Sequence, residues 1–234
     1  MSLFSFDNTA GASQSSTNLL EGNKIHDVTF EEATMEDFQG RQDPNATYKV
    51  IKLKFKNEDG TFEHSIFEPI KDRGDFDRGV REFVKDGKQQ SMPTPSNVEV
   101  MMLLIKHVID AVRPEAGAKI DSGEVSLGAK TWDELRKVVT EILNKGKGAK
   151  TKIKLLTDNK GYGRFPGFFT GISRDGKCYV RDNFIGNKVG FSPYEISRIK
   201  AASVAKPTDM SSPSLDDAPT SDLSDINDFD LASL

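Results

Sequence analysis

The chain has 234 residues, a formal net charge of −4 and one cysteine, Cys178. That length allows one sizeable domain, or two small ones, with a buried core. No apolar run approaches the ~20 residues that a membrane-spanning helix needs, and the N-terminal residues do not have the pattern of a secretory signal. A single cysteine excludes an intramolecular disulfide framework, so we expect a protein of a reducing cytoplasm.

The net charge is unevenly distributed along the chain. Residues 145–207 contain fourteen Lys and Arg against four Asp and Glu, whereas residues 208–234 contain seven Asp and no Lys or Arg. A basic block is therefore followed directly by an acidic tail. The slightly acidic average does not exclude a polyanionic partner, although a solvated face with a solubilising tail would explain the charges equally well.

The first predicted elements are β-strands. Residues 1–23 are rich in Ser and Thr and are predicted to be a disordered N-terminal arm, followed by a short strand at 24–30. The segment TYKVIKLKFK at 47–56 alternates between an apolar face and a face that carries Lys52, Lys54, Lys56 and Tyr48. An Asp-Gly turn and a return strand at 61–69 complete a hairpin.

The middle of the chain is predicted to be a helical insertion over about 75–146. It comprises one or two turns at 75–84, a helix from Ser96 or Asn97 to just before Pro114, and another over 131–146. The residues between the two longer helices are expected to be mainly loop.

Strands resume after the insertion. TKIKLLTD at 151–158 repeats the earlier alternation, with Lys152 and Lys154 predicted to point outward. A glycine-rich turn at 159–167 then carries Lys160, Tyr162, Arg164 and Phe165. Three short strands or strand pieces follow, and residues 194–200 close the folded part.

This order predicts an α+β fold with an antiparallel β-barrel over residues 24–201. The barrel resembles an oligonucleotide/oligosaccharide-binding (OB) fold with helices inserted between its early and late strands, and an SH3-like barrel fused to a helical pair is the alternative. Residues 202–234 are predicted to be a disordered acidic tail.

Enzymatic chemistry has no clear signature in the sequence. His26, His64 and His107 are scattered and have no neighbours at metal-ligand spacing. The glycine-rich segments match neither a phosphate-binding loop nor a dinucleotide fingerprint, and no nucleophile-elbow motif is present. We therefore predict a binding protein that uses no metal and no cofactor.

A basic, aromatic β surface is the remaining feature. Single-stranded nucleic acids bind to a positive groove that follows the phosphates and to aromatic rings on which the bases stack. Tyr162 and Phe165 are the preferred stacking residues, and one of the adjacent pair Phe168 and Phe169 must be exposed if both lie on a strand. The full candidate set is Tyr48, Lys52, Lys54, Lys56, Lys152, Lys154, Lys160, Tyr162, Arg164, Phe165, Phe168, Arg174, Tyr179 and Arg181.

The final segment, DINDFDLASL, resembles the acidic, hydrophobic-tipped C-terminus of bacterial and bacteriophage single-stranded DNA-binding proteins. The resemblance implies sequence-independent binding of single-stranded DNA in replication, recombination or repair, in the cytoplasm of a bacterial host. It also implies a tail that recruits replication proteins through Asp225, Asp228, Phe229, Asp230 and Leu231. The serine-rich N-terminus and the inserted helices look more like the phage-encoded members.

Two other functions fit the same sequence. An RNA-binding or transcription-associated barrel would use the same surface, and RNA would then bind at least as well as matched DNA. A virion structural or assembly protein with an acidic scaffold tail would bind no nucleic acid even at low salt.

Overall fold

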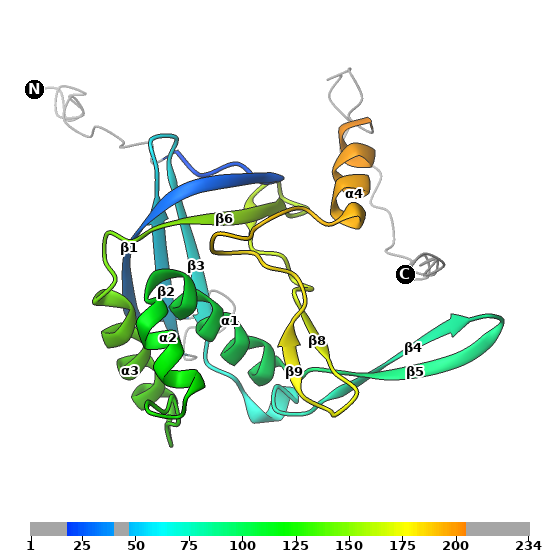
Figure 1. The fold of residues 1–234 in the computed structure, drawn as a ribbon, viewed down its shortest axis with the longest axis horizontal. Coiled ribbons are helices and arrows are strands. Elements are labelled where there is room, and N and C mark those ends of the chain that lie inside the picture. Colours follow the sequence, from blue (N-terminus) through cyan, green and yellow to red (C-terminus); the bar gives the residue numbers. More distant parts are fainter. Residues whose placement is uncertain (1–17, 40–46, 205–234) are drawn as a thin grey trace, which may run out of the picture.

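The computed structural model describes residues 18–39 and 47–204. They form a curled antiparallel sheet, and the helices between residues 97 and 144 pack on its concave side (Figure 1). The mixed α+β class and the antiparallel half-barrel agree with the sequence prediction. Most of the predicted N-terminal arm and nearly all of the predicted tail, including Asp225, Asp228, Phe229, Asp230 and Leu231, lie outside the described residues.

The sheet has five strands in the order β3-β2-β1-β6-β7, and all neighbours are antiparallel. Their bounds are β1 Lys24–Gln39, β2 Thr47–Lys56, β3 Thr61–Phe67, β6 Lys150–Thr157 and β7 Gly163–Arg164. The long strand β1 pairs with β6 through its first part and with β2 through its second, with an irregularity between Phe30 and Glu32. Such a bulge bends a strand, so β1 can pair with β6 in one half of the curled sheet and with β2 in the other.

The predicted alternation in β2 is confirmed. Ile51, Leu53 and Phe55 are buried, while the lysines between them lie on the opposite, outer face of the sheet. In the core, Phe55 meets Phe30 edge to face, with 5.4 Å between the ring centroids. Leu20 is buried as well and donates its backbone N–H to the carbonyl of Thr61, so packing begins ahead of residue 24.

Four α-helices occur within the described residues: α1 Asn97–Val112, α2 Pro114–Asp121, α3 Trp132–Asn144 and α4 Pro193–Val204. Ser96 caps α1, one of the two starts that the sequence predicted, and it forms a capping box with Glu99. Helix α2 occupies a segment that we expected to be loop. Helices α1 and α3 bury their apolar faces in the core through residues such as Val108, Ile109, Val139 and Leu143.

The prediction of helix at 75–84 is wrong. After a short 3-10 turn, η2 (Lys71–Arg73), β4 (Gly79–Lys85) and β5 (Lys88–Thr94) form a hairpin that projects from the body (Figure 1). Asp86 and Gly87 form its two-residue turn with φ values of 53° and 69°, and Asp-Gly is a favoured pair for that left-handed conformation. We call this hairpin the β4–β5 arm.

A second small ribbon lies at the base of the arm. It consists of β8 (Thr170–Ile172) and β9 (Cys178–Val180), which correspond to two of the predicted strand pieces. The chain then returns to the sheet, where the backbone N–H of Lys154 donates to the carbonyl of Phe184 and that of Gly186 donates to Lys152. These bonds link the chain that follows the ribbon to β6, and β8 also contacts β5 of the arm.

Candidate nucleic-acid interface

The outer face of the sheet was predicted to be basic, but it is electrically balanced. The ammonium group of Lys52 lies 2.6 Å from a carboxylate oxygen of Glu36, and that of Lys54 lies 3.3 Å from Glu31. Lys56 also pairs with Glu31, and its hydrogen bond is the main cause that holds the pKa of Glu31 below its ordinary value. Glu31 and Glu36 lie on β1, and Glu63 on β3 lies 3.8 Å from Lys52, so the three lysines form cross-strand ion pairs.

Tyr48 lies on the same outer face, at the end of the sheet where β1 finishes and β2 begins. Its ring stacks on Phe38 with 5.7 Å between centroids, and Phe38 meets Phe67 edge to face at 6.0 Å. Phe38 and Phe67 are exposed. This small aromatic cluster has exposed ring surface on which a base could stack, but part of that surface is covered by the contacts between the three rings.

Lys154 does not point outward as predicted, because its side chain is 0% exposed. Its ammonium group lies 2.8 Å from carboxylate oxygens of both Asp182 and Glu195 and 3.0 Å from the carbonyl of Gly190. The later chain covers this part of β6, so the face opposite Ile153 and Leu155 is also buried. Lys154 is therefore unavailable to phosphate. Lys152 is half exposed, with its ammonium group 3.8 Å from Asp27.

Asp158 organises the turn between β6 and β7. Its carboxylate accepts the backbone N–H groups of Lys160 and Tyr162, each at 2.9 Å, and pairs with the side chain of Arg164. The ion pair with Arg164 is the main reason that the pKa of Asp158 is lowered. Tyr162 remains 53% exposed at the tip of this turn, and Lys160 is exposed beside it.

Phe165, one of the two preferred stacking residues, belongs to the core. Its ring centroid lies 4.8 Å from that of Phe62, 4.7 Å from that of Phe184 and 4.9 Å from that of His64. A ring enclosed by three others has no face left for a base. Both preferred stacking residues lie between glycines in the sequence, and this pattern did not indicate that Tyr162 is exposed and Phe165 is buried.

The best candidate site is on the β8–β9 ribbon. Phe168 is 81% exposed while Phe169 is buried, so one ring of this pair faces outward as expected, although both residues precede β8 and do not lie on a strand. The guanidinium group of Arg181 donates to the backbone carbonyl of Phe168 at 2.9 Å, so a cation is held at the backbone of the residue that carries the exposed ring. Tyr179 is 44% exposed.

Glycine explains how Tyr179 is presented. Gly171 is its cross-strand partner, and a Cβ atom at Gly171 would stand 3.0 Å from the tyrosine ring. The ring therefore lies down over the ribbon and shows one face to solvent. Arg174 is exposed at the turn of the same ribbon. We call this site the β8–β9 surface, defined by Phe168, Arg174, Tyr179 and Arg181.

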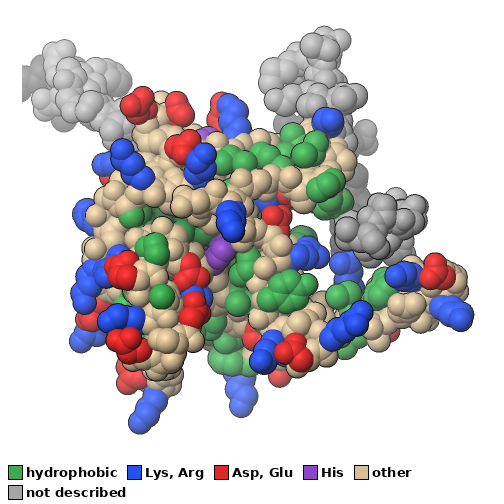
Figure 2. All heavy atoms as spheres, viewed as in Figure 1, with side chains coloured by type: hydrophobic (Ala, Val, Ile, Leu, Met, Phe, Trp, Pro, Cys, Tyr) green, Lys and Arg blue, Asp and Glu red, His purple; other side chains and the backbone are tan. Residues whose placement is uncertain are grey.

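The charges of the β8–β9 surface differ from those of the outer sheet face. Among the described residues, no carboxylate lies within ion-pair distance of Arg174 or Arg181. Figure 2 shows hydrophobic side chains at the surface over this ribbon and the nearby arm, with Lys and Arg side chains and also Asp and Glu side chains beside them. The same view shows mixed charges on the helical side.

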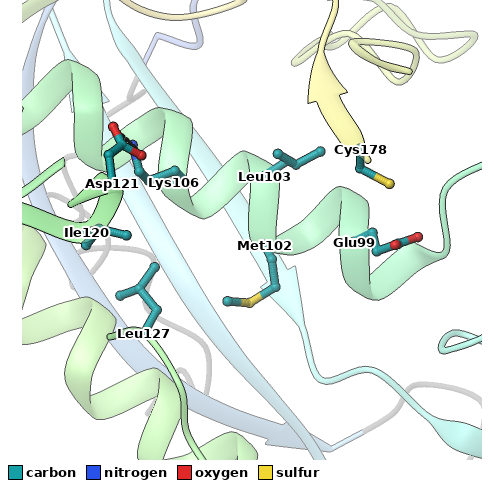
Figure 3. Close-up of a pocket in the computed structure, with 8 residues that line it drawn as sticks. All are labelled: Glu99, Met102, Leu103, Lys106, Ile120, Asp121, Leu127 and Cys178. Atoms are coloured by element: carbon teal, nitrogen blue, oxygen red, sulfur yellow. Dashed lines mark hydrogen bonds and ion pairs between the residues drawn. The ribbon is translucent and has the colours of Figure 1, made fainter. Parts of the chain in front are cut away.

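One open hollow of about 410 Å³ lies against α1 (Figure 3). Its walls are mainly apolar, formed by residues such as Met102, Leu103, Ile120 and Leu127. The charged groups at its rim are already paired, since Lys106 bonds to Asp110 and Asp121 and Glu99 bonds to Arg78. These features do not suit a polyanion, so the hollow is a weaker nucleic-acid site than the β8–β9 surface.

Within residues 18–39 and 47–204, no cluster of three or more His, Cys, Asp or Glu is placed to hold a metal ion. Nor is any helix in that part of the chain long and apolar enough to cross a membrane. Comparison with protein-family models, with curated proteins and with solved structures finds no match to this chain. Any functional assignment therefore depends on the geometry and chemistry described above.

Proposed function

We propose that this protein binds single-stranded DNA without sequence preference. The observation that carries the proposal is the β8–β9 surface, where the ring of Phe168 is exposed and the guanidinium group of Arg181 donates a hydrogen bond to the backbone carbonyl of the same residue. Bases in a single strand have free faces that can stack on such a ring, while a neighbouring cation binds the phosphate. Any base can stack in this way, so the contact gives affinity without reading sequence.

Tyr162 and Lys160 extend the proposed site toward the sheet. They follow β6, and the ribbon that carries Tyr179 follows β7, so one continuous stretch of chain supplies both places. Exposed rings at two places allow successive bases to stack separately. This arrangement favours an extended single strand over a duplex, whose bases are already stacked on one another.

An OB-type barrel is the fold we propose for this function. The support is the central position of a long, bent β1 that pairs with both β2 and β6, together with helices inserted between β3 and β6. Five-stranded OB barrels bind oligonucleotides across one side with the help of their connecting loops. The β8–β9 surface would serve as part of such a loop region.

We further propose that binding is an equilibrium process in which no bond is made or broken. A role in replication or recombination, with the acidic tail recruiting partner proteins, rests on the resemblance of the last residues to the tails of single-stranded DNA-binding proteins. The proposal of DNA binding does not depend on that role, because it stands on the β8–β9 surface alone.

Fluorescence titration of the full chain with labelled oligo-dT, at two salt concentrations, tests the proposal. Binding should weaken steeply with salt because phosphate contacts release counterions. Phe168→Ala should cost ~1–3 kcal/mol of binding free energy for the lost stacked base. Arg181→Ala should reduce the slope of log affinity against log salt by ~0.7, the value for one phosphate contact on a single strand.

Phe67→Ala is a matched control, because Phe67 is an exposed ring on the outer sheet face and is not one of the residues that define the β8–β9 surface. Loss of binding in Phe67→Ala but not in Phe168→Ala would place the interface on the outer sheet face instead. Preference for oligo-U over oligo-dT would make the protein an RNA-binding protein. No binding of either strand at low salt would reject the proposal.

A further inference from the structure

The β4–β5 arm has no strand neighbour within the described part of the chain. β4 and β5 form a two-stranded sheet of their own, separate from the five-stranded sheet. Val80 and Val84 are 68% and 70% exposed, so the arm buries little apolar surface of its own. An isolated two-stranded ribbon is only marginally stable in water, which makes a projecting arm of this kind a candidate for contact with a partner.

The two faces of the arm differ in charge. Cross-strand partners share a face, and the register pairs Arg81 with Met92, Phe83 with Gln90 and Lys85 with Lys88. This face carries three cations, one aromatic ring and no carboxylate. The opposite face carries Val80, Val84, Pro93 and a single charge, Glu82, whose carboxylate accepts a hydrogen bond from Gln89 at 3.0 Å. We call the first of these the basic face of the arm.

The positive charges of the lysines on the basic face are available to an anionic ligand. No carboxylate among the described residues lies within ion-pair distance of Lys85 or Lys88, and both side chains are exposed. The lysines of the outer sheet face present the contrast, since each of them faces a glutamate. Two cations side by side at the arm tip, with Phe83 next along the face, repeat the combination of charge and ring found on the β8–β9 surface.

The base of the arm is fixed beside that surface. The Nε atom of Arg78 lies 3.0 Å from both carboxylate oxygens of Glu99, and its guanidinium group lies 3.6 Å from the sulfur of Cys178 on β9. Just before it, Asp75 is buried and accepts hydrogen bonds from the backbone of Ile70 and the side chain of Asn97. The arm therefore starts from a braced position next to the β8–β9 ribbon (Figure 1).

We propose that the basic face of the β4–β5 arm is a second part of the single-stranded DNA interface, which takes up the strand after it leaves the β8–β9 surface. Lys85 and Lys88 bind consecutive phosphates and Phe83 provides ring surface for a base. This inference rests on the proposed function, since it extends the same bound strand. A second copy of the chain would instead dock on the opposite face of the arm, which carries Val80 and Val84 and has no excess of positive charge.

Oligonucleotides of two lengths separate the arm from the β8–β9 surface. An oligo-dT of about 8 nucleotides lies within the ~4–16 nucleotides that one OB-type domain covers, and one of about 30 extends past it. The double variant Lys85→Ala/Lys88→Ala should bind the short oligonucleotide as the parent chain does. It should bind the long one several-fold more weakly, with a salt slope smaller by ~1.4, the value for two phosphate contacts.

The double variant Lys137→Ala/Lys145→Ala is the matched control. It removes the same charge from exposed positions at helix α3 and its C-terminus, so it should leave both affinities and both slopes unchanged. Lysine footprinting of the unaltered chain gives a second readout that does not depend on a variant. The long oligonucleotide should protect Lys85 and Lys88 from an amine-reactive reagent, and the short one should leave them reactive.

The outcomes separate this inference from the proposed function. If oligo-dT of both lengths binds the arm variant as tightly as the parent chain, with equal slopes and no protection of Lys85 and Lys88, the arm is outside the interface while the proposed function stands. If the unaltered chain binds neither oligonucleotide, the proposed function fails first. Concentration-dependent dimers that Val84→Lys abolishes, without a change in DNA binding, would assign the arm to a second copy.

Discussion

At Lys154 a buried ammonium group joins three parts of the chain. It lies on β6, bonds to Asp182 after the β8–β9 ribbon, and bonds to Glu195 in the first turn of α4. Glu195 also accepts the backbone N–H of Ser192 and so helps to cap that helix. Despite burial, which opposes ionisation, the hydrogen bond from Lys154 contributes to a pKa of Glu195 below its ordinary value.

Replacement of Lys154 by Met should destabilise the fold strongly. The substitution keeps the length of the side chain but leaves two carboxylates without their buried cation, and breaking such a group typically costs about 3–5 kcal/mol. Urea unfolding would measure the change, with Lys152→Met on the half-exposed neighbouring position as the control. A loss below ~1 kcal/mol would show that Asp182 and Glu195 do not need this cation.

His64 gives the fold a pH dependence. Its ring packs against Phe165, and burial, with a smaller contribution from the charge of Arg164, lowers its pKa from 6.5 to about 4. Between pH 6.5 and 4 the unfolded chain therefore binds a proton that the folded chain does not. The free energy of unfolding should fall as the pH is lowered through this window, by up to ~1.4 kcal/mol per pH unit.

His64→Gln removes that ionisable group, so its stability should change less between pH 6.5 and 4 than that of the parent chain. The carboxylates of Asp75 and Glu99, each with a pKa of about 2, lose their contribution only as the pH falls below about 4.5. Denaturant titrations at several pH values would measure both slopes. If the free energy of unfolding changed with pH in parallel for the two proteins, His64 would be excluded as the source of this pH dependence.

The alternation of apolar and polar residues predicts which side chains of a strand are buried when one face of the strand is covered. It fails when both faces are covered. The Lys-x-Lys register is the same at Lys52/Lys54 and at Lys152/Lys154, yet Lys154 is fully buried. Its partners are 28 and 41 residues further along the chain, so no local pattern indicates them. Similarly, Phe165 and Phe168 are three residues apart, and only tertiary packing decides which ring is exposed.

At the scale of elements, strong local sequence signals were sufficient to predict the type and position of β2, α1 and α3. β2 has the predicted bounds, and the caps of α1 and α3 are at Ser96 and Thr131. The β4–β5 arm was missed because Val80, Phe83 and Val84 have the i, i+3, i+4 spacing of a helix. The Asp86–Gly87 turn was the opposing signal, and it determines the structure because an Asp-Gly pair readily adopts the left-handed conformation of a tight hairpin.

The arm should be the least protected strand pair in amide hydrogen exchange. Its hydrogen bonds join only β4 to β5 and are covered by few apolar side chains. β1, in contrast, pairs with β6 through its first part and with β2 through its second, and it packs against helix α3. Local opening of the arm should therefore need far less free energy than opening of β1. Mass spectrometry of peptides covering 79–94 and 24–39 would compare them. Equal protection would mean that the arm is covered by another surface in solution.

For the whole molecule, position along the sequence is a poor guide to the position of charge. The lysines of the outer sheet face are balanced by glutamates on β1 and β3, so that face has little excess positive charge. Some cations without a carboxylate partner among the described residues, such as Lys85 and Lys88, lie on the β4–β5 arm. Others lie in the later part of the chain, at Lys160, Arg174, Arg181 and Lys188. This is the part that directly precedes the acidic residues 208–234.

Deletion of residues 208–234 should tighten binding to oligo-dT. That segment has seven Asp and no Lys or Arg, and it is joined covalently to a block with an excess of ten positive charges. A tethered polyanion of this kind competes with DNA at an effective concentration of millimolar order. The gain should be largest at low salt, where screening is weakest, and should shrink toward zero as salt is raised.

Phe229→Ala would separate the charge of this segment from its apolar residues. The variant keeps all seven Asp, so DNA affinity should remain close to that of the parent chain, while capture of replication proteins should be lost if Phe229 anchors them. Titrations of the parent, the deletion and the point variant with one oligo-dT, at two salt concentrations, would measure the first effect. Equal affinities in all three at low salt would show that the acidic segment does not reach the DNA-binding surface.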